Sequence, residues 1–197
     1  MMKLSNRVLE MEESVTLAAS ARAAALKAEG RDILSLTLGE PDFTTPENIQ
    51  KAAIAAIQDG KASFYTAASG LPALKDAISS YMETFYGYAV PRNQVVVATG
   101  AKFILYAAFA TLLNPGDEVI IPTPCWVSYV DQVKMVDAVP VTFQTTEAND
   151  FKATVEQLEA ARTEKTKLIL LNSPSNPTGM IYSREELEAI GAWALEH

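Results

Sequence analysis

The chain has 197 residues and a net charge of −8, which argues against nucleic acid or an anionic membrane as a partner, since both attract basic surfaces. Hydrophobic residues make up 49% and charged residues 20%, a composition that is typical of a globular protein and excludes a disordered one. Cys125 is the sole cysteine, which excludes an internal disulfide and fits a reduced, cytoplasmic setting.

The N-terminal residues predict a helix and a short strand. Polar and acidic side chains follow the first residues, where a signal peptide would have an apolar core, so we expect no signal peptide. Residues 14–27 are rich in alanine and predict a helix that stops at Gly30. Residues 33–37 then predict a short strand.

Proline marks the start of the next two helices. Thr45 followed by Pro46 predicts a helix with a capping hydroxyl and a proline in its first position, ending near Gly60. Residues 69–72 (Ser-Gly-Leu-Pro) predict the other start, and that helix should continue to about residue 85.

From residue 94 onward, predicted strands alternate with predicted helices. The strands cover residues 94–98, 118–121, 139–143 and 167–171. The helices cover residues 101–113, 127–136 and 154–162, and a last helix opens with the capping box of Ser183 and Glu186. The apolar run 103–113 is far shorter than the ~20 residues that span a bilayer. The alternation is typical of an α/β fold with a largely parallel sheet and helices on both faces.

The octet Asn-Ser-Pro-Ser-Asn-Pro-Thr-Gly, residues 172–179, follows the last predicted strand. Its two prolines, its small polar residues and its glycine hold the backbone in a fixed turn. Open α/β sheets place ligand-binding groups in such loops at the carboxyl ends of strands. The octet is therefore the strongest candidate for a binding loop in this chain.

Two other loops follow predicted strands. Gly100 lies between a strand and a helix, where unpaired N–H groups of the first helical turn bind phosphate readily, although a plain turn would look the same. Trp126 follows the next strand and could stack on a planar ring or belong to the core. Cys125 is more often a small buried hydrophobe than a nucleophile, and the sole histidine, His197, lies at the far end of the sequence. Tyr65, in an earlier loop, could bind a phosphate or be a half-buried surface residue.

Together with residues 39–43 (Gly-Glu-Pro-Asp-Phe), these loops resemble one family in one order. From about residue 4 to the last, the chain is similar to the N-terminal portion of the class I and II aminotransferases of fold type I. These enzymes use pyridoxal 5'-phosphate (PLP), and the chain is nearest to the bacterial aspartate aminotransferases. The resemblance implies that residues 1–45 form an N-terminal arm and part of a small domain. Residues 46–197 would be the N-terminal portion of the large PLP-binding domain, with the sheet incomplete.

The resemblance also implies a role for each matching residue. Asn176 would hydrogen-bond the ring hydroxyl oxygen of the cofactor, and Trp126 would stack on its ring. Backbone and side-chain groups of Gly100, Ala101 and Lys102 would line the phosphate site. Tyr65 would reach the phosphate of a neighbouring subunit, which implies a homodimer. The backbone of Gly39 would lie against the substrate's α-carboxylate. With Trp126 and Asn176, Lys102 would also contact the substrate, holding the distal carboxylate of a dicarboxylic amino acid.

The implied activity is transfer of an amino group between an amino acid, aspartate or glutamate, and a 2-oxo acid. The family's Schiff-base lysine lies beyond the matched stretch, so we assign no catalytic residue here and expect the 197-residue chain alone to be inactive. We predict no metal site. Two alternatives remain: another PLP reaction on the same scaffold, such as that of a β-lyase or a synthase, and a non-catalytic PLP-fold sensor or interaction module.

Overall fold

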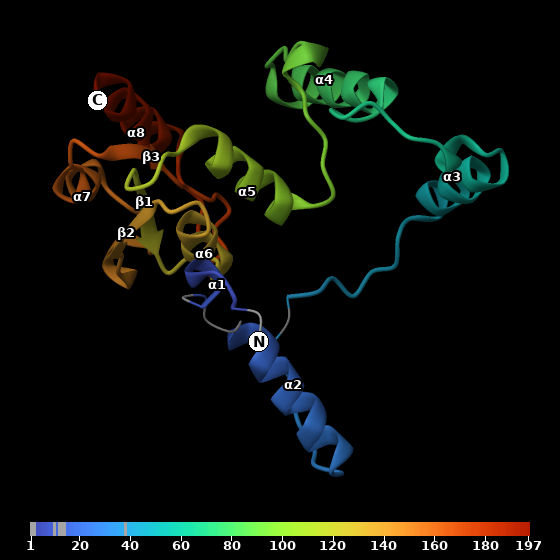
Figure 1. Ribbon diagram of the computed structural model, residues 1–197, viewed down its shortest axis with the longest axis horizontal. Coiled ribbons are helices and arrows are strands. Elements are labelled where there is room, and N and C mark those ends of the chain that lie inside the picture. The colour runs from blue at the N-terminus through green and yellow to red at the C-terminus, as the bar shows by residue number, and fades with distance from the viewer. Residues whose placement is uncertain (1–2, 10, 12–14, 38) are drawn as a thin grey trace. The chain divides into compact units, whose positions relative to one another are not determined.

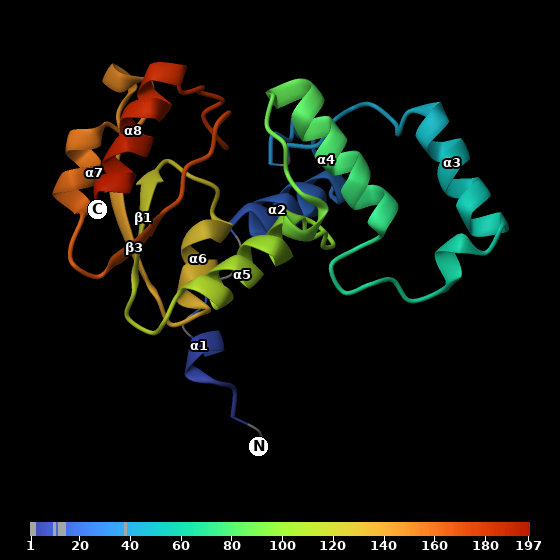
Figure 2. The same cartoon turned by 90° about the horizontal axis from the view of Figure 1, so that it is seen from above.

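The computed structural model describes residues 3–9, 11, 15–37 and 39–197 (Figures 1 and 2). The chain divides into two compact units, one of residues 1–14 with 102–197 and the other of residues 15–101. The first unit contains the described strands, which are β1 (Glu118–Thr123), β2 (Val139–Gln144) and β3 (Thr166–Ile169). Its described helices are α1 (Asn6–Leu9), α6 (Ser128–Lys134), α7 (Val155–Ala161), α8 (Arg184–Glu196) and all but the first residue of α5 (Ala101–Leu112).

The three strands form a parallel sheet in the order β2-β1-β3. Glu118 is level with Val139 of β2 and with Thr166 of β3, and a register irregularity follows on the β3 side. The central residues of β1, Val119 to Ile121, are fully buried. A parallel strand that is covered on both faces reads as a continuous apolar run, which is why this segment was predictable.

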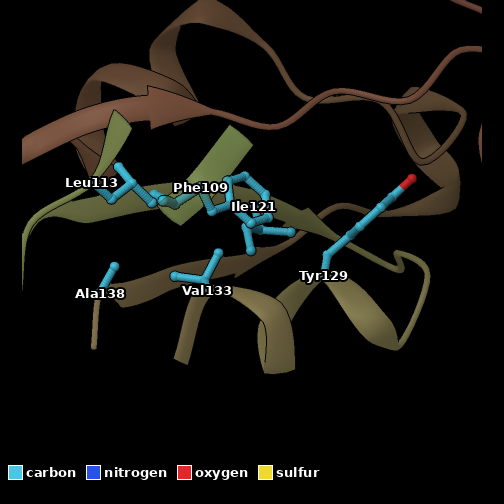
Figure 3. Packing of buried hydrophobic residues seen from close by; sticks show 7 residues of the cluster. Phe109, Leu113, Ile121, Tyr129, Val133 and Ala138 are labelled. Atoms are coloured by element: carbon cyan, nitrogen blue, oxygen red, sulfur yellow. The ribbon is translucent and has the colours of Figure 1, made fainter. Parts of the chain in front are cut away.

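Helices cover both faces of this sheet. Val119 and Ile121 of β1 belong to a buried cluster on one face of the sheet. Figure 3 shows Ile121 with Phe109 of α5 and Val133 of α6 in this cluster. Ile120 points to the opposite face and packs with a second cluster, which includes Leu158 of α7 and Ile190 and Trp193 of α8. The predicted α/β layering is therefore present in residues 102–197.

Capping fixes the starts of two of these helices. Thr154 accepts a hydrogen bond from the backbone N–H of Gln157 and begins α7, while Gln157 returns a bond to the Thr154 N–H. Ser183 and Glu186 make the same reciprocal pair at the start of α8. The predicted capping box is therefore confirmed, and each pair satisfies N–H groups that the helix itself leaves free.

The unit of residues 15–101 is helical in its described part. Its helices are α2 (Val15–Ala28), α3 (Glu47–Gln58) and α4 (Pro72–Tyr86), with 3-10 turns at Lys61–Ser63 and Arg92–Gln94. All three helices were predicted within a few residues, although Ser14, the predicted start of the first, lies outside the described residues. The cap of α3 is Pro46 without a side-chain hydrogen bond, so the prediction that Thr45 caps it was wrong.

Two predicted strands are not strands in the structure. Residues 33–37 and 94–98 carry no strand, although Val95 has extended backbone angles. A strand is held by hydrogen bonds to a neighbouring strand. The Val97 N–H instead donates to the carbonyl of Ser69 at 3.0 Å, and Ser69 is not part of a strand. The apolar, β-branched composition of these segments favours an extended backbone, but it does not determine whether a neighbouring strand pairs with them.

Candidate functional site

The loops that follow β1 and β3 meet at the carboxyl edge of the sheet. Pro124, Cys125 and Asn176 line a cavity of about 20 Å³ there, together with Tyr129 of α6. This volume holds about one water molecule. A larger ligand would therefore lie against these side chains rather than inside the cavity.

The octet loop, residues 172–179, is held by its own hydrogen bonds. The Asn172 side chain accepts from the Asn176 N–H at 2.9 Å, and the Ser175 carbonyl accepts from the Gly179 N–H at 2.8 Å. The Ser173 hydroxyl accepts from the Tyr182 N–H at 3.1 Å, which ties the loop to the segment before α8. The side chain of Asn176 is left exposed and has no hydrogen-bond partner among the described residues. Its amide is therefore available to a ligand.

Trp126, which directly follows the cavity-lining Cys125, forms an aromatic platform. Tyr129 packs edge-on against its ring, with ring centroids 5.3 Å apart. The Nζ atom of Lys102 lies over the same ring, 5.2 Å from the centroid. At an exposed position such a cation–π contact is worth only about 0.5–1 kcal/mol, and Lys102 is exposed. A second contact acts on its backbone, because the buried Gln132 side chain donates from Nε2 to the Lys102 carbonyl at 2.8 Å.

The N-terminus of α5 offers donors to an anion. Gly100, directly before the helix, has a φ of +85°, and an added Cβ there would meet nothing within 4 Å. None of the described residues accepts a hydrogen bond from the backbone N–H of Ala101 or Lys102. Unpaired first-turn N–H groups and the helix dipole both favour a phosphate at such a position.

The structure brings three of the predicted site residues, Lys102, Trp126 and Asn176, into the unit of residues 102–197. Gly39, Tyr65, Gly100 and Ala101 belong to the other unit, in which Gly39 and Tyr65 are exposed. The division falls within the first turn of α5, so Gly100 and Ala101 directly precede Lys102 in the chain.

Sequence reasoning missed the residues that support the platform. Tyr129 and Gln132 follow Trp126 by three and six positions, and both are buried. A glutamine at a buried position of α6 signals burial at most, and it does not reveal which carbonyl the side chain contacts. Cys125 is half-buried, and burial raises the pKa of its thiol, which keeps it protonated. Among the described residues, no cluster of metal-ligating side chains occurs and no helix is long and apolar enough to cross a membrane.

The model of the family "aminotransferase class I and II" matches residues 31–197. An asparagine–oxo-acid transaminase from Streptococcus mutans is 74% identical over 197 residues, which are 100% of this chain and 50% of that protein. An aspartate aminotransferase from a Bacillus species is 50% identical over 194 residues, 98% of this chain and 49% of that protein. The chain spans about half the length of these curated relatives.

Solved structures give the same result. The aspartate aminotransferase from Rhizobium meliloti superposes with a TM-score of 0.95 at 43% identity, covering 100% of this chain and 49% of that one. The Thermus thermophilus aspartate aminotransferase with maleate gives 0.95 at 40%, covering 100% and 51%. The fold is thus the α/β fold of the PLP-dependent transferases, present in part. The chain belongs to the class I and II aminotransferases, a family that depends on PLP.

Proposed function

We propose that this chain forms part of a PLP-dependent aminotransferase that transfers an amino group between an acidic amino acid, aspartate or glutamate, and a 2-oxo acid. The observation that carries the proposal is the match of residues 31–197 to the aminotransferase family. Two observations at the carboxyl edge of the sheet support it. Asn176 and Cys125 line one cavity, and Trp126, the residue after Cys125, has the Lys102 ammonium over its ring.

The residues present fit PLP. The open space at Gly100 suits a phosphate, which would be held at the start of α5. The N–H groups of Ala101 and Lys102, to which no described residue offers an acceptor, would bind it. Trp126 offers a face to the pyridine ring, and Asn176 offers an amide donor to the ring hydroxyl oxygen. Bound PLP supplies an electron sink for chemistry at the substrate's α-carbon.

Lys102 supplies the substrate preference in this proposal. Its ammonium group beside Trp126 would bind the distal carboxylate of aspartate or glutamate. The backbone of Gly39 would lie against the α-carboxylate. Asparagine is a second candidate donor, because the relative with 74% identity is named for it. Its amide is neutral, so it would gain less from Lys102.

Several wider features belong to the same proposal. The fully exposed Tyr65 is free to reach the cofactor phosphate of a second subunit, so we propose a homodimer. We also propose a cytoplasmic location, which the sole cysteine, Cys125, fits. We propose that residues 1–45 serve as an arm and part of a small domain, and that residues 46–197 belong to the PLP-binding domain. The 197-residue chain alone should bind PLP weakly and not transaminate, which is supported by relatives of twice its length.

The test uses the whole protein that contains this sequence, loaded with PLP. Aspartate, glutamate, asparagine and alanine are offered one at a time, and the loss of cofactor absorbance and the 2-oxo acid product are followed. We expect aspartate or glutamate to react fastest. A β-lyase would instead release ammonia, and a synthase would form a product with a new bond to carbon. An interaction module would leave the cofactor absorbance unchanged with every amino acid.

The matched variant is Lys102→Met, which keeps the length of the side chain and removes its charge. We expect it to raise KM for aspartate and glutamate about tenfold or more, and to change the KM for asparagine little. Equal losses for all donors, or alanine as the best donor of the wild type, would contradict the assignment to acidic amino acids.

A further inference from the structure

Gln132 is buried in α6, and its two polar atoms have different surroundings. Its Nε2 donates to the backbone carbonyl of Lys102 at 2.8 Å. Its Oε1 is buried and has no hydrogen-bond partner among the described residues. The orientation of the amide follows from this, since the flipped amide would place two acceptor oxygens against each other.

Stability alone does not account for a glutamine at this position. A buried acceptor without a partner is unfavourable. Methionine has a similar length and would fill the same space without an orphaned oxygen. The Lys102 carbonyl lies in the first turn of α5 and has a second lone pair for the helix bond. The hydrogen bond that Gln132 does make acts on the backbone of Lys102.

The contact connects two elements of the site. Gln132 lies six residues after Trp126 on the segment that forms the platform, and Lys102 lies at the start of α5. The hydrogen bond thus fixes the backbone of Lys102 relative to the tryptophan ring over which its Nζ atom stands, 5.2 Å from the centroid. Among the described residues, the weak contact to the ring is the one interaction given for the long, exposed lysine side chain.

We propose that Gln132 is a positioning residue that holds Lys102 over Trp126 and thereby sets the affinity of the site for a dicarboxylate substrate. The proposal rests on the proposed function, in which Lys102 binds the distal carboxylate. Gln132 itself need not touch the substrate.

The test compares Gln132→Met, Lys102→Met and the double variant in the whole PLP-loaded protein, with maleate as the dicarboxylate probe in titration calorimetry. Gln132→Met should raise the Kd of maleate about three- to tenfold, the range expected for the loss of one neutral hydrogen bond. The double variant should bind maleate no more weakly than Lys102→Met, because both changes act through the same lysine. Independent, additive losses would overturn the proposal.

A second measurement reports on the surroundings of the Trp126 ring in the absence of substrate. With 5-fluorotryptophan incorporated, the fluorine resonance of Trp126, identified by its loss in Trp126→Phe, should shift in Gln132→Met and in Lys102→Met. The control is Asn149→Leu, which removes another amide-to-carbonyl bond of 2.8 Å, from Asn149 Nδ2 to the Lys152 carbonyl. It should move neither the resonance nor the affinity for maleate.

The outcomes separate the two proposals. A wild-type protein that binds no maleate would overturn the assignment to acidic substrates, while the resonance would still show whether Gln132 holds Lys102. An unshifted resonance in Gln132→Met, or a shifted one with unchanged maleate affinity, would overturn the role of Gln132. Because Gln132→Met removes an orphaned oxygen, we expect it to fold. Gln132→Asn, which shortens the reach by one methylene, should act in the same direction.

Discussion

At Gly70 the backbone passes very close to Val97. A Cβ atom added to Gly70 would lie 2.8 Å from the Val97 Cβ, a distance that real Cβ atoms do not adopt. The φ of Gly70 is +102°, a backbone conformation that residues with a Cβ rarely adopt. The contact matters because Val97 is on the segment that leads to Gly100, and its N–H donates to the Ser69 carbonyl beside Gly70.

Gly70→Ala should therefore destabilise the chain more than an ordinary glycine substitution. The control is Gly30→Ala, where φ is +82° and nothing lies within 4 Å of an added Cβ, so it changes only the backbone strain. We expect the control to cost about 1 kcal/mol and Gly70→Ala a further ~1–3 kcal/mol of overpacking. Denaturant unfolding of both variants measures the difference. Equal effects would show that Val97 moves aside freely.

Some single residues of the site could be predicted from the sequence, and others could not. The octet loop, Trp126 and Gly100 could be proposed because glycine, proline and aromatic residues at strand ends restrict what the backbone can do. Gln132 could not, because its importance depends on a contact with Lys102, thirty residues away in the chain. Nothing local to a glutamine in a helix reveals which carbonyl it reaches.

At the level of elements, a single carboxylate connects α7 and α8. Glu159 of α7 accepts hydrogen bonds from the Arg162 side chain at 2.8 and 2.9 Å and from the Trp193 indole of α8 at 2.9 Å. Arg162 first, and then Trp193, lower the pKa of Glu159 from 4.5 to about 2. A carboxyl whose pKa is lower in the folded state stabilises that state fully above its ordinary pKa, and the stabilisation is lost as the pH falls toward the lowered value.

Glu159→Gln should therefore reduce the free energy of unfolding above about pH 5, and its effect should shrink as the pH falls from 4.5 toward 2. Denaturant unfolding of the wild type and the variant across this range gives the measurement. Glu188→Gln is the control, since Glu188 pairs on the exposed side of α8 with Arg184 at 3.7 Å. An effect of Glu159→Gln that grows toward low pH would contradict the assigned cause.

Strands were predicted best where a partner strand lies in the same unit. The segments now seen as β1, β2 and β3 became strands because they pair with one another. Residues 33–37 have similar apolar character, but no described strand pairs with them, and Leu34 and Leu36 are each 88% exposed. Local composition predicts that a segment can extend, whereas long-range pairing decides whether it becomes a strand.

For the whole molecule, the two units differ in how much core each contains. Residues 102–197 bury two apolar clusters on opposite faces of a sheet. In the described part of residues 15–101, Val95 and Lys75 are the two buried residues, and Lys75 donates to the Ser69 hydroxyl at 2.8 Å. Helix α3 leaves Ile49, Ile54 and Ile57 exposed. Burial of apolar area is the main source of stability, so the stability of the 197-residue chain should be unevenly distributed.

Hydrogen exchange of the 197-residue chain, read by mass spectrometry, tests this distribution. The amides of β1, in a strand that pairs on both sides, should exchange slowest, through global unfolding of their unit. The amides of α3 and of residues 33–37 should exchange orders of magnitude faster, because few buried contacts resist local opening. Ile120→Ala, a large-to-small change at a fully buried position, should accelerate exchange in β1 and leave α3 unchanged. Two results would show one cooperative unit in place of two. One is that the amides of α3 are as protected from exchange as those of β1, and the other is that Ile120→Ala lowers the protection of both.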